Sequence, residues 1–201
     1  MHPDILTKTQ AGLLPLIKQF SASFYLVGGT ALALQLGHRR SIDFDLFTNQ
    51  PFDNLHLRSL IKKRHIIDRA LIETKTEFTL FVDNIKITFY HYHYPIKHLI
   101  SFDKIITIPD PLTIAAMKAF ALGHRAKWKD YVDLFFIFQS FPLKKVIAKT
   151  VSIYHNEFDE KLFREQLAYH EDLDYSEPIE YMPGFSVKDK IIKQKLIAVS
   201  L

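Results

Sequence analysis

The sequence predicts an α/β protein in which an N-terminal lobe with a mixed sheet, residues 1–108, precedes a helical lobe, residues 109–201. Three observations lead to this prediction: an apolar strand that stops at two glycines, a β-hairpin pattern, and a proline-rich boundary followed by apolar residues at helical spacing. In the chain these features fall at Phe24–Val27, Thr76–Tyr90 and Pro109–Pro111.

The first elements of the chain are a helix, the short strand and a second helix. Apolar residues predict a helical region over Ile5–Phe20, in which Pro15 would kink or split the helix. After the strand, Thr30 would cap a helix that reaches Leu36, because its side-chain oxygen can accept a hydrogen bond from a free N–H group. Gly37 would end this helix, since glycine readily adopts a left-handed conformation.

The segment from Ser41 to Phe47 alternates apolar and acidic residues, which is typical of a strand. Asp43 and Asp45 would therefore share one face, and the other face would be apolar and begin with Ile42. Two carboxylates on one face are unusual in a strand, and this pair is the main candidate for chemistry in the chain.

The remaining elements of the first lobe are a helix and further strands. Pro51 is placed to open a helix that runs to about Arg64. Ile66–Ile72 is a candidate edge strand. Asp83 and Asn84 separate two segments rich in β-branched and aromatic residues, so these segments would pair as a hairpin.

The second lobe is predicted to be helical throughout. Leu112–Leu122 is almost wholly apolar and reads as a buried helix that Gly123 ends. A further helix would begin near Trp128. The last three predicted helices are Leu143–Tyr154, Asp159–Tyr169 and Val187–Leu201.

Composition restricts the classes of function. The 201 residues, 48% hydrophobic and 24% charged, suffice for one substantial core or two small lobes. The chain has no cysteine, which excludes disulfide and thiolate chemistry and fits a cytoplasmic location. Neither a signal-peptide pattern nor an apolar run long enough for a membrane span is present. The net charge of +4 permits a polyanionic partner such as nucleic acid without requiring one.

The glycine pair and the aspartate pair together favour a site for a metal-bound nucleotide. Gly28 and Gly29 would let a ligand approach the backbone, and the free N–H groups at the start of the next helix suit a phosphate. Asp43 and Asp45 would lie about 7 Å apart along the strand, where a divalent cation bound to a triphosphate would offset their repulsion. Taken singly, the glycines also fit a tight turn and the aspartates a solvated edge strand.

The stretch Gly-Gly-Thr-Ala-Leu, followed by His-Arg-x-Ser-x-Asp-Phe-Asp-Leu-Phe, resembles the nucleotidyltransferase superfamily, and in particular its AbiEii/AbiGii toxin branch. The resemblance implies a nucleotidyltransferase-like lobe, with the helical lobe closing a nucleotide cleft. It implies Mg²⁺ or Mn²⁺ held by Asp43 and Asp45. The residues that would bind the nucleotide in this lobe are Gly28, Gly29, Thr30, Arg39 and Ser41.

The same resemblance implies an activity and partners. The enzyme would transfer a nucleotide from a nucleoside triphosphate to a hydroxyl of RNA (tRNA) or protein. It would be the toxin of a toxin–antitoxin or abortive-infection system, with a protein antitoxin as its partner and no membrane association.

One feature of the superfamily is missing. A third carboxylate usually comes from a neighbouring strand, where it helps to activate the attacking hydroxyl. The matching strand here offers Lys86 or Thr88 instead. Members of the AbiEii-like branch often lack this carboxylate and rely on downstream residues.

Downstream residues also match the branch. Lys118 is the one charge in an apolar helix; its ammonium would either reach water or point towards a triphosphate or the aspartates. Asp130 and Asp133, three apart on one helix face, follow in a Lys-Asp-x-x-Asp segment. By resemblance, Lys118 and Asp130 are predicted catalytic residues, with Asp130 the candidate for the missing acidic role, while Arg125 and Asp133 would bind the nucleotide.

Two other clusters are weaker candidates. His91 and His93 share a strand face at a spacing that a metal could use, but no third ligand is evident, which favours an exposed strand end. The acidic segment His170–Pro178 lacks the glycine and spacing of a calcium loop, so a solvated loop is the default interpretation. An acidic segment recurs near this position in the AbiEii-like branch, and the resemblance therefore offers cleft lining as the alternative interpretation.

Two alternative functions follow from the missing carboxylate. The first is a degenerate nucleotidyltransferase that binds nucleotide or RNA without catalysis. The second is a protein-interaction module, which absence of nucleotide binding would mark.

Overall fold

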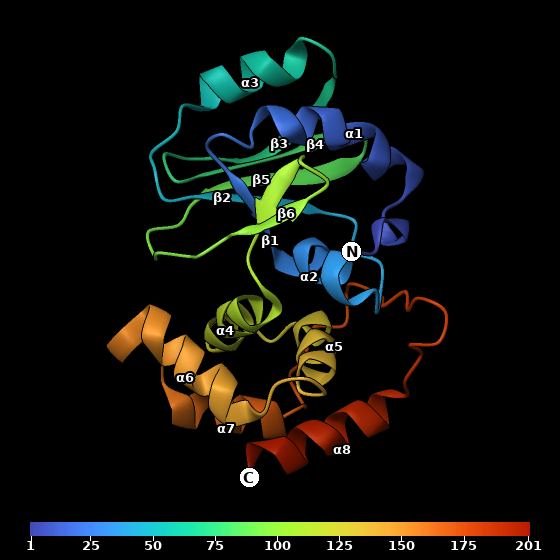
Figure 1. The fold of residues 1–201 in the computed structure, drawn as a ribbon, viewed down its shortest axis with the longest axis vertical. Coiled ribbons are helices and arrows are strands. Elements are labelled where there is room, and N and C mark those ends of the chain that lie inside the picture. Colours follow the sequence, from blue (N-terminus) through green and yellow to red (C-terminus); the bar gives the residue numbers. More distant parts are fainter. The chain divides into compact units, whose positions relative to one another are not determined.

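A computed structural model describes residues 1–201 and confirms a mixed α/β protein. The chain divides into two compact units, Met1–Pro109 and Asp110–Leu201, each described here by itself. The first unit carries all the strands and the second is helical (Figure 1). None of the helices combines the length and the apolar character that a membrane span requires.

The first unit contains a short 3₁₀-helix and an α-helix before a five-stranded sheet, two more helices and a separate two-stranded ribbon. In chain order its elements are η1 (Pro3–Ile5), α1 (Lys8–Gln19), β1 (Tyr25–Val27), α2 (Gly28–Leu36), β2 (Phe44–Thr48), α3 (Asn54–Lys62), β3 (Ile67–Glu73), β4 (Glu77–Val82), β5 (Ile85–His91), β6 (Ile100–Phe102) and β7 (Ile106–Ile108).

The five-stranded sheet has the order β1-β2-β5-β4-β3. Only β2 and β5 run parallel, and the other neighbours are antiparallel. In Figure 1, α1 and α3 cover one face of the sheet and α2 lies on the other. The face towards α1 and α3 is fully buried at Phe44, Leu46 and Phe89, so alternation directs Asp45 and Thr88 to the opposite face.

An aromatic cluster holds α1 against the sheet. The Phe89 ring of β5 meets the rings of Phe20 and Phe24 edge-on, with centroids 4.9 Å and 5.2 Å apart. Edge-to-face pairs of this kind add about 0.5–1.5 kcal/mol each to the burial of the rings. The cluster fixes the sheet from behind and leaves its other face to polar side chains.

The predicted hairpin and edge strand are both present. Asp83 and Asn84 form the two-residue turn between β4 and β5 with φ of 51° and 61°, the left-handed conformation that such turns require. The edge strand β3 pairs only with β4. The ribbon β6–β7 was not predicted, because two three-residue strands show little periodicity.

Several predicted boundaries of the first unit are wrong. Helix α1 continues through Pro15, because the carbonyl that loses its partner belongs to the exposed Ala11 and can bind water. Helix α3 starts at Asn54 rather than Pro51, since the Asp53 carboxylate caps it by accepting a hydrogen bond from the Leu55 N–H at 2.9 Å.

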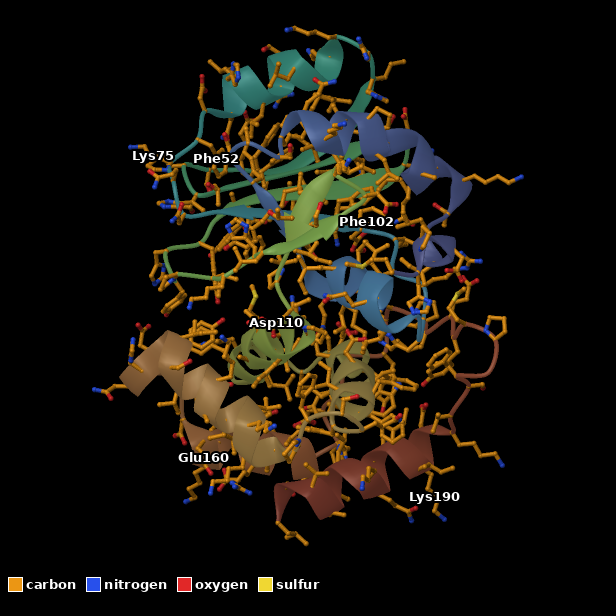
Figure 2. All side chains as sticks on the ribbon, in the orientation of Figure 1. Phe52, Lys75, Phe102, Asp110, Glu160 and Lys190 are labelled. Carbon is orange, nitrogen blue, oxygen red and sulfur yellow. The ribbon has the colours of Figure 1, made fainter.

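The second unit contains α4 (Pro111–Leu122), α5 (Trp128–Ile137), α6 (Leu143–Tyr154), η2 (His155–Glu157), α7 (Glu160–Ala168) and α8 (Asp189–Ser200). Asp110, labelled in Figure 2, caps α4 by accepting hydrogen bonds from the N–H and hydroxyl of Thr113. Gly123 follows α4 as predicted, but with φ of −63° it keeps a right-handed conformation, so the chain leaves the helix without a left-handed cap.

Candidate active site

The glycine turn between β1 and α2 is built around the side chains expected to hold a nucleotide. Gly28 has φ of +72°, and a Cβ atom there would stand 2.2 Å from the Asp45 Oδ2. A Cβ at Gly29 would stand 2.7 Å from the Arg39 guanidinium and 2.8 Å from the Ser41 hydroxyl. Gly28 is required by its left-handed backbone, and the turn brings the residues predicted from the motif into one cluster.

Gly28→Ala is therefore expected to lower both stability and activity. The added methyl group meets the Asp45 carboxylate and forces a left-handed backbone on alanine, so we expect a loss of more than about 1 kcal/mol of unfolding free energy. Gly12→Ala is the matched control, since a Cβ at Gly12 has no neighbour within 4 Å and the change should stabilise α1. Urea denaturation of the two variants compares them directly; equal stability of Gly28→Ala and the parent would contradict the packing described.

Thr30 has a different role from the predicted cap. Helix α2 starts at Gly28 with Val27 as its cap residue. The buried Thr30 hydroxyl instead donates to the Asp43 carbonyl and, at 3.3 Å, to the Ser41 carbonyl. The capping prediction is wrong because the helix begins two residues earlier, at Gly28, and the Thr30 hydroxyl is used by these carbonyls. Thr30 thus positions the segment that carries Asp43.

Arg39 lies beneath the glycine turn rather than on the surface. It is 4% exposed, and its guanidinium donates to the Arg40 carbonyl at 2.8 Å while also facing Gly29. Its positive charge adds to that of the α2 N-terminus. The turn is consequently an electropositive patch beside two carboxylates, which suits the phosphates of a metal-bound nucleotide.

The two aspartates lie at the start of β2. The regular strand begins at Phe44, one residue after Asp43, and Ile42 is 58% exposed. The prediction that Ile42 belongs to the apolar face is wrong, because Thr30 draws the backbone before Phe44 towards α2. Asp45 stays within the strand.

The neighbouring strand β5 completes this face of the sheet. Thr88 is the register partner of Asp45, and the Lys86 ammonium lies 2.7 Å from the Asp43 Oδ2. No carboxylate therefore occupies either position on β5. Along the same row, the Thr79 hydroxyl of β4 donates to the Glu77 carboxylate at 2.7 Å.

The donor set fits a divalent ion that the substrate helps to hold. The structure contains no group of three or more His, Cys, Asp or Glu side chains arranged for a metal. Mg²⁺ characteristically takes one or two carboxylates and completes its shell with substrate phosphates and water. Asp43 and Asp45, beside the glycine turn, match that pattern. The two histidines at the end of β5 belong to no such group.

A second cluster of predicted residues lies in the helical unit. Lys118 of α4 places its ammonium 2.6 Å from the Asp130 Oδ1 and 2.7 Å from the Asp133 Oδ2, both on α5. Arg125 contacts the other Asp130 oxygen at 3.1 Å. Both aspartates are fully buried and Lys118 is 5% exposed, so its ammonium does not reach water as one interpretation held.

Asp130 stays ionised in this cluster. Burial by itself raises the pKa of a carboxyl, but the nearby Lys118 and Arg125 charges outweigh it and hold the pKa of Asp130 below its usual value. Both of its oxygens are occupied by cations. Arg125 differs from the rest because half of its side chain remains exposed, which leaves it accessible to an anion.

The acidic segment near residue 175 is tied down rather than free. The Glu177 carboxylate binds the ammonium groups of both Lys127 and Lys129. The backbone of Asp174 exchanges hydrogen bonds with Ala126 and Trp128 at 2.8 Å and 3.0 Å. Most of the segment is exposed irregular chain, as the interpretation as a solvated loop predicts, and an ion pair between residues 50 apart in sequence ties it to the start of α5.

This pairing predicts an acid-sensitive contribution to stability. Burial raises the pKa of Glu177, but hydrogen bonds from Lys127 and Lys129 prevail and lower it from 4.5 to about 2. A lowered folded-state pKa stabilises the fold above the unfolded value, and that stability is lost as the pH falls from about 4.5 towards 2. In thermal melts, Glu177→Gln should lower the melting temperature at pH 7 and have less effect near pH 2; an equal effect at both would contradict this.

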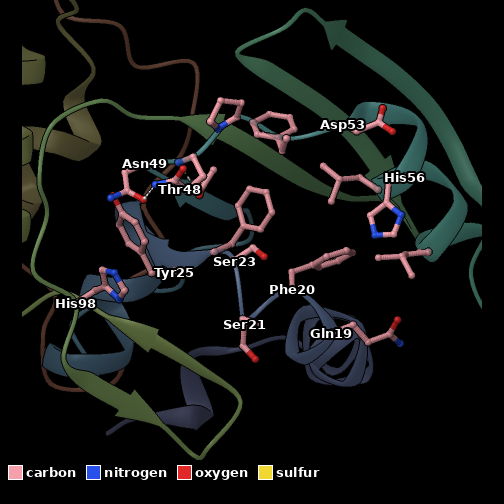
Figure 3. Close-up of a pocket in the computed structure, with 17 residues that line it drawn as sticks. Gln19, Phe20, Ser21, Ser23, Tyr25, Thr48, Asn49, Asp53, His56 and His98 are labelled. Atoms are coloured by element: carbon pink, nitrogen blue, oxygen red, sulfur yellow. Dashed lines mark hydrogen bonds between the residues drawn. The ribbon is translucent and has the colours of Figure 1, made fainter.

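A hollow of about 540 Å³ also opens in the first unit, between the end of α1, the start of β1 and α3 (Figure 3). Phe20, Phe24 and Phe52 line it, as does Tyr25, whose buried hydroxyl has no hydrogen-bond partner and whose pKa burial raises. It includes none of the residues predicted to hold the nucleotide, so it is distinct from the glycine–aspartate cluster.

Comparisons with known proteins agree with this arrangement. The fold is that of nucleotidyltransferases: a putative nucleotidyltransferase from Helicobacter pylori superimposes with a TM-score of 0.63 at 18% identity, covering 96% of this chain and 92% of that one. MenT4, a nucleotidyltransferase toxin from Mycobacterium tuberculosis H37Rv, gives a TM-score of 0.63 at 16% identity, with 96% and 81% covered.

The family follows from the sequence match. Residues 16–191 match the model of the nucleotidyl transferase AbiEii toxin family, described as a type IV toxin–antitoxin system. An uncharacterised protein of Aquifex aeolicus (strain VF5) is 36% identical over 155 residues, 74% of each chain. The chain belongs to the AbiEii nucleotidyltransferase toxin family, which confirms the resemblance predicted from the two motifs.

Proposed function

We propose that this chain is a divalent-metal-dependent nucleotidyltransferase toxin that moves a nucleotide from a nucleoside triphosphate to a hydroxyl on RNA, such as tRNA, or on a protein. The observation that carries the proposal is the contact between the Gly28 turn and the Asp45 carboxylate. It joins an anion-binding turn to a metal-binding carboxylate pair in one compact site. The family implies a cognate protein antitoxin, and the proposal places the protein in the cytoplasm.

The residues have separable roles in this proposal. The backbone at Gly28 and Gly29 binds phosphate oxygens, with Arg39 adding positive charge beneath the turn. Asp43 and Asp45 hold the Mg²⁺ or Mn²⁺, which when bound neutralises charge on the triphosphate. The acceptor oxygen bonds to the α-phosphorus, the bond to the β-phosphate oxygen breaks, and pyrophosphate leaves with that electron pair. The acceptor proton passes to solvent.

We propose a role in the same reaction for the charged residues of the second cluster. The buried Asp130 holds Lys118 and orients Arg125, and the exposed part of Arg125 is then available to a triphosphate. Asp133 shares the Lys118 charge. In this proposal Asp130 acts by positioning these cations, since both of its oxygens are already paired.

Incubation of the purified chain with labelled triphosphates tests the proposal. Each of the four nucleotides, labelled at the α- or the γ-phosphate, is offered with Mg²⁺ to total RNA and to cell protein. Nucleotidyl transfer predicts α-label and no γ-label in an acceptor. γ-Label in the acceptor would mean phosphoryl transfer, and no label in any acceptor would contradict the proposal.

The absence of a carboxylate on β5 favours one other candidate, a chain that binds nucleotide without transferring it. Calorimetry separates the two. Magnesium-dependent triphosphate binding with no transfer would support the binding-only candidate. Equal binding of the triphosphate with and without magnesium would contradict a role for the metal in either candidate function.

A further inference from the structure

We propose that the Lys86 ammonium stands where a second cation would otherwise bind, so that the site takes one divalent ion per nucleotide rather than two. The inference rests on the proposed metal-dependent function and concerns how many ions that function uses. It starts from the ion pair between Lys86 Nζ and Asp43 Oδ2 at 2.7 Å.

The sheet register places Lys86 at this position. Because β2 and β5 run parallel with Phe44 opposite Ile87, Lys86 lies beside Asp43 and Thr88 beside Asp45. Ile87 is fully buried on the other face, so alternation directs Lys86 to the face that carries the aspartates. The contact therefore follows from strand geometry as well as from the reach of a flexible side chain.

The burial of the pair strengthens its effect on a nearby cation. The Lys86 and Asp43 side chains are 30% and 20% exposed. At partly buried positions such as these, charges are screened less than in bulk water. A divalent ion that bound Asp43 beside the ammonium would be repelled at close range.

Charge accounting leads to the same number of ions. The side chains at positions 43, 45 and 86 carry a summed charge of −1, because Lys86 offsets one of the two aspartates. With a carboxylate at position 86 the sum would be −3. The difference of two charges equals that of one divalent ion. The other acidic side chain of this face, Glu77, accepts a hydrogen bond from Thr79 on β4 and does not restore the missing charge at Lys86.

In this arrangement Lys86 is a positioning residue. It fixes the orientation of Asp43 and supplies permanent positive charge, while Asp43, Asp45 and the triphosphate would hold the single ion. Lys86→Asp would replace that charge with a third carboxylate, and Lys86→Met would remove it and keep the stem. Lys86→Arg would keep the charge.

Electron paramagnetic resonance of bound Mn²⁺ tests the inference independently of turnover. Mn²⁺ is titrated into the purified chain with the non-transferable α,β-methylene analogue of each of the four triphosphates. We expect one Mn²⁺ per chain and an uncoupled signal for the parent and for Lys86→Arg. Lys86→Asp should bind two ions with a spin-coupled signal, as ions about 3.5–4 Å apart produce.

The controls keep the outcomes distinct. Lys97→Met, which changes an exposed lysine of the same unit, should match the parent. If Lys86→Asp does not fold, a second ion in Lys86→Met serves as the readout. Two bound ions in the parent would overturn this inference. A single bound ion in every folded variant that lacks the positive charge, Lys86→Asp or Lys86→Met, would overturn it as well. Both results would leave metal dependence intact. No bound Mn²⁺ in any form would refute the proposed metal-dependent function itself.

Discussion

Cells that express Asp45→Asn should grow at the normal rate while cells that express the parent chain stop growing. The substitution preserves the shape of the side chain and deletes the charge that would hold the metal. Phe44 and Leu46 still pack behind the strand, so the protein should fold and accumulate. Loss of one such electrostatic contact costs about 10²–10³-fold in turnover. Growth curves at matched protein levels are the measurement.

The control for this prediction is Asp103→Asn. Asp103 is exposed and lies in the β6–β7 turn with φ of 46°, a conformation that asparagine tolerates well. This variant should remain as toxic as the parent. If Asp45→Asn were equally toxic, growth inhibition would not come from nucleotidyl transfer, and the binding-only candidate would be the better one.

Lys118→Met should be the most destabilising single substitution in the helical unit. It leaves Asp130 with only the half-exposed Arg125 and removes the ammonium that binds the fully buried Asp133. Removing one partner from a buried ion pair costs about 3–5 kcal/mol, because the remaining charge is left uncompensated. Denaturant unfolding of the purified variant measures the loss.

The triple variant with Lys118→Met, Asp130→Leu and Asp133→Leu separates charge from packing. It replaces all three charged side chains by apolar ones, so most of the lost stability should return. Activity should not return with it, since Arg125 would lose the carboxylate that orients it. Unchanged stability of Lys118→Met alone would show that the ammonium does not compensate the buried aspartates.

The sequence was most informative where function depends on short local patterns. The two glycines, the alternating aspartates and the helical spacing of Asp130 and Asp133 each lie within a few residues, and the structure clusters each group. The turn at Asp83–Asn84 could also be predicted from the local sequence, because aspartate and asparagine are among the few residues that adopt the left-handed φ of a two-residue hairpin turn.

Features that depend on contacts between residues far apart in the sequence could not be predicted. The contact of Lys86 with Asp43 needs the parallel register of β2 and β5, which no local pattern encodes. The Lys127–Glu177 pair joins residues 50 apart. A hydroxyl at a helix start predicts a cap, but Thr30 donates to carbonyls of a segment that only the tertiary fold brings near.

Pyrophosphate release by the purified chain with Mg²⁺, a triphosphate and its acceptor is the most direct measurement of nucleotide transfer by the glycine–aspartate site. Pyrophosphate should appear in equal amounts with the nucleotide joined to the acceptor, and both should vanish when Mg²⁺ is chelated or when Asp45 is replaced by asparagine. Undiminished pyrophosphate release by Asp45→Asn would contradict transfer by this site.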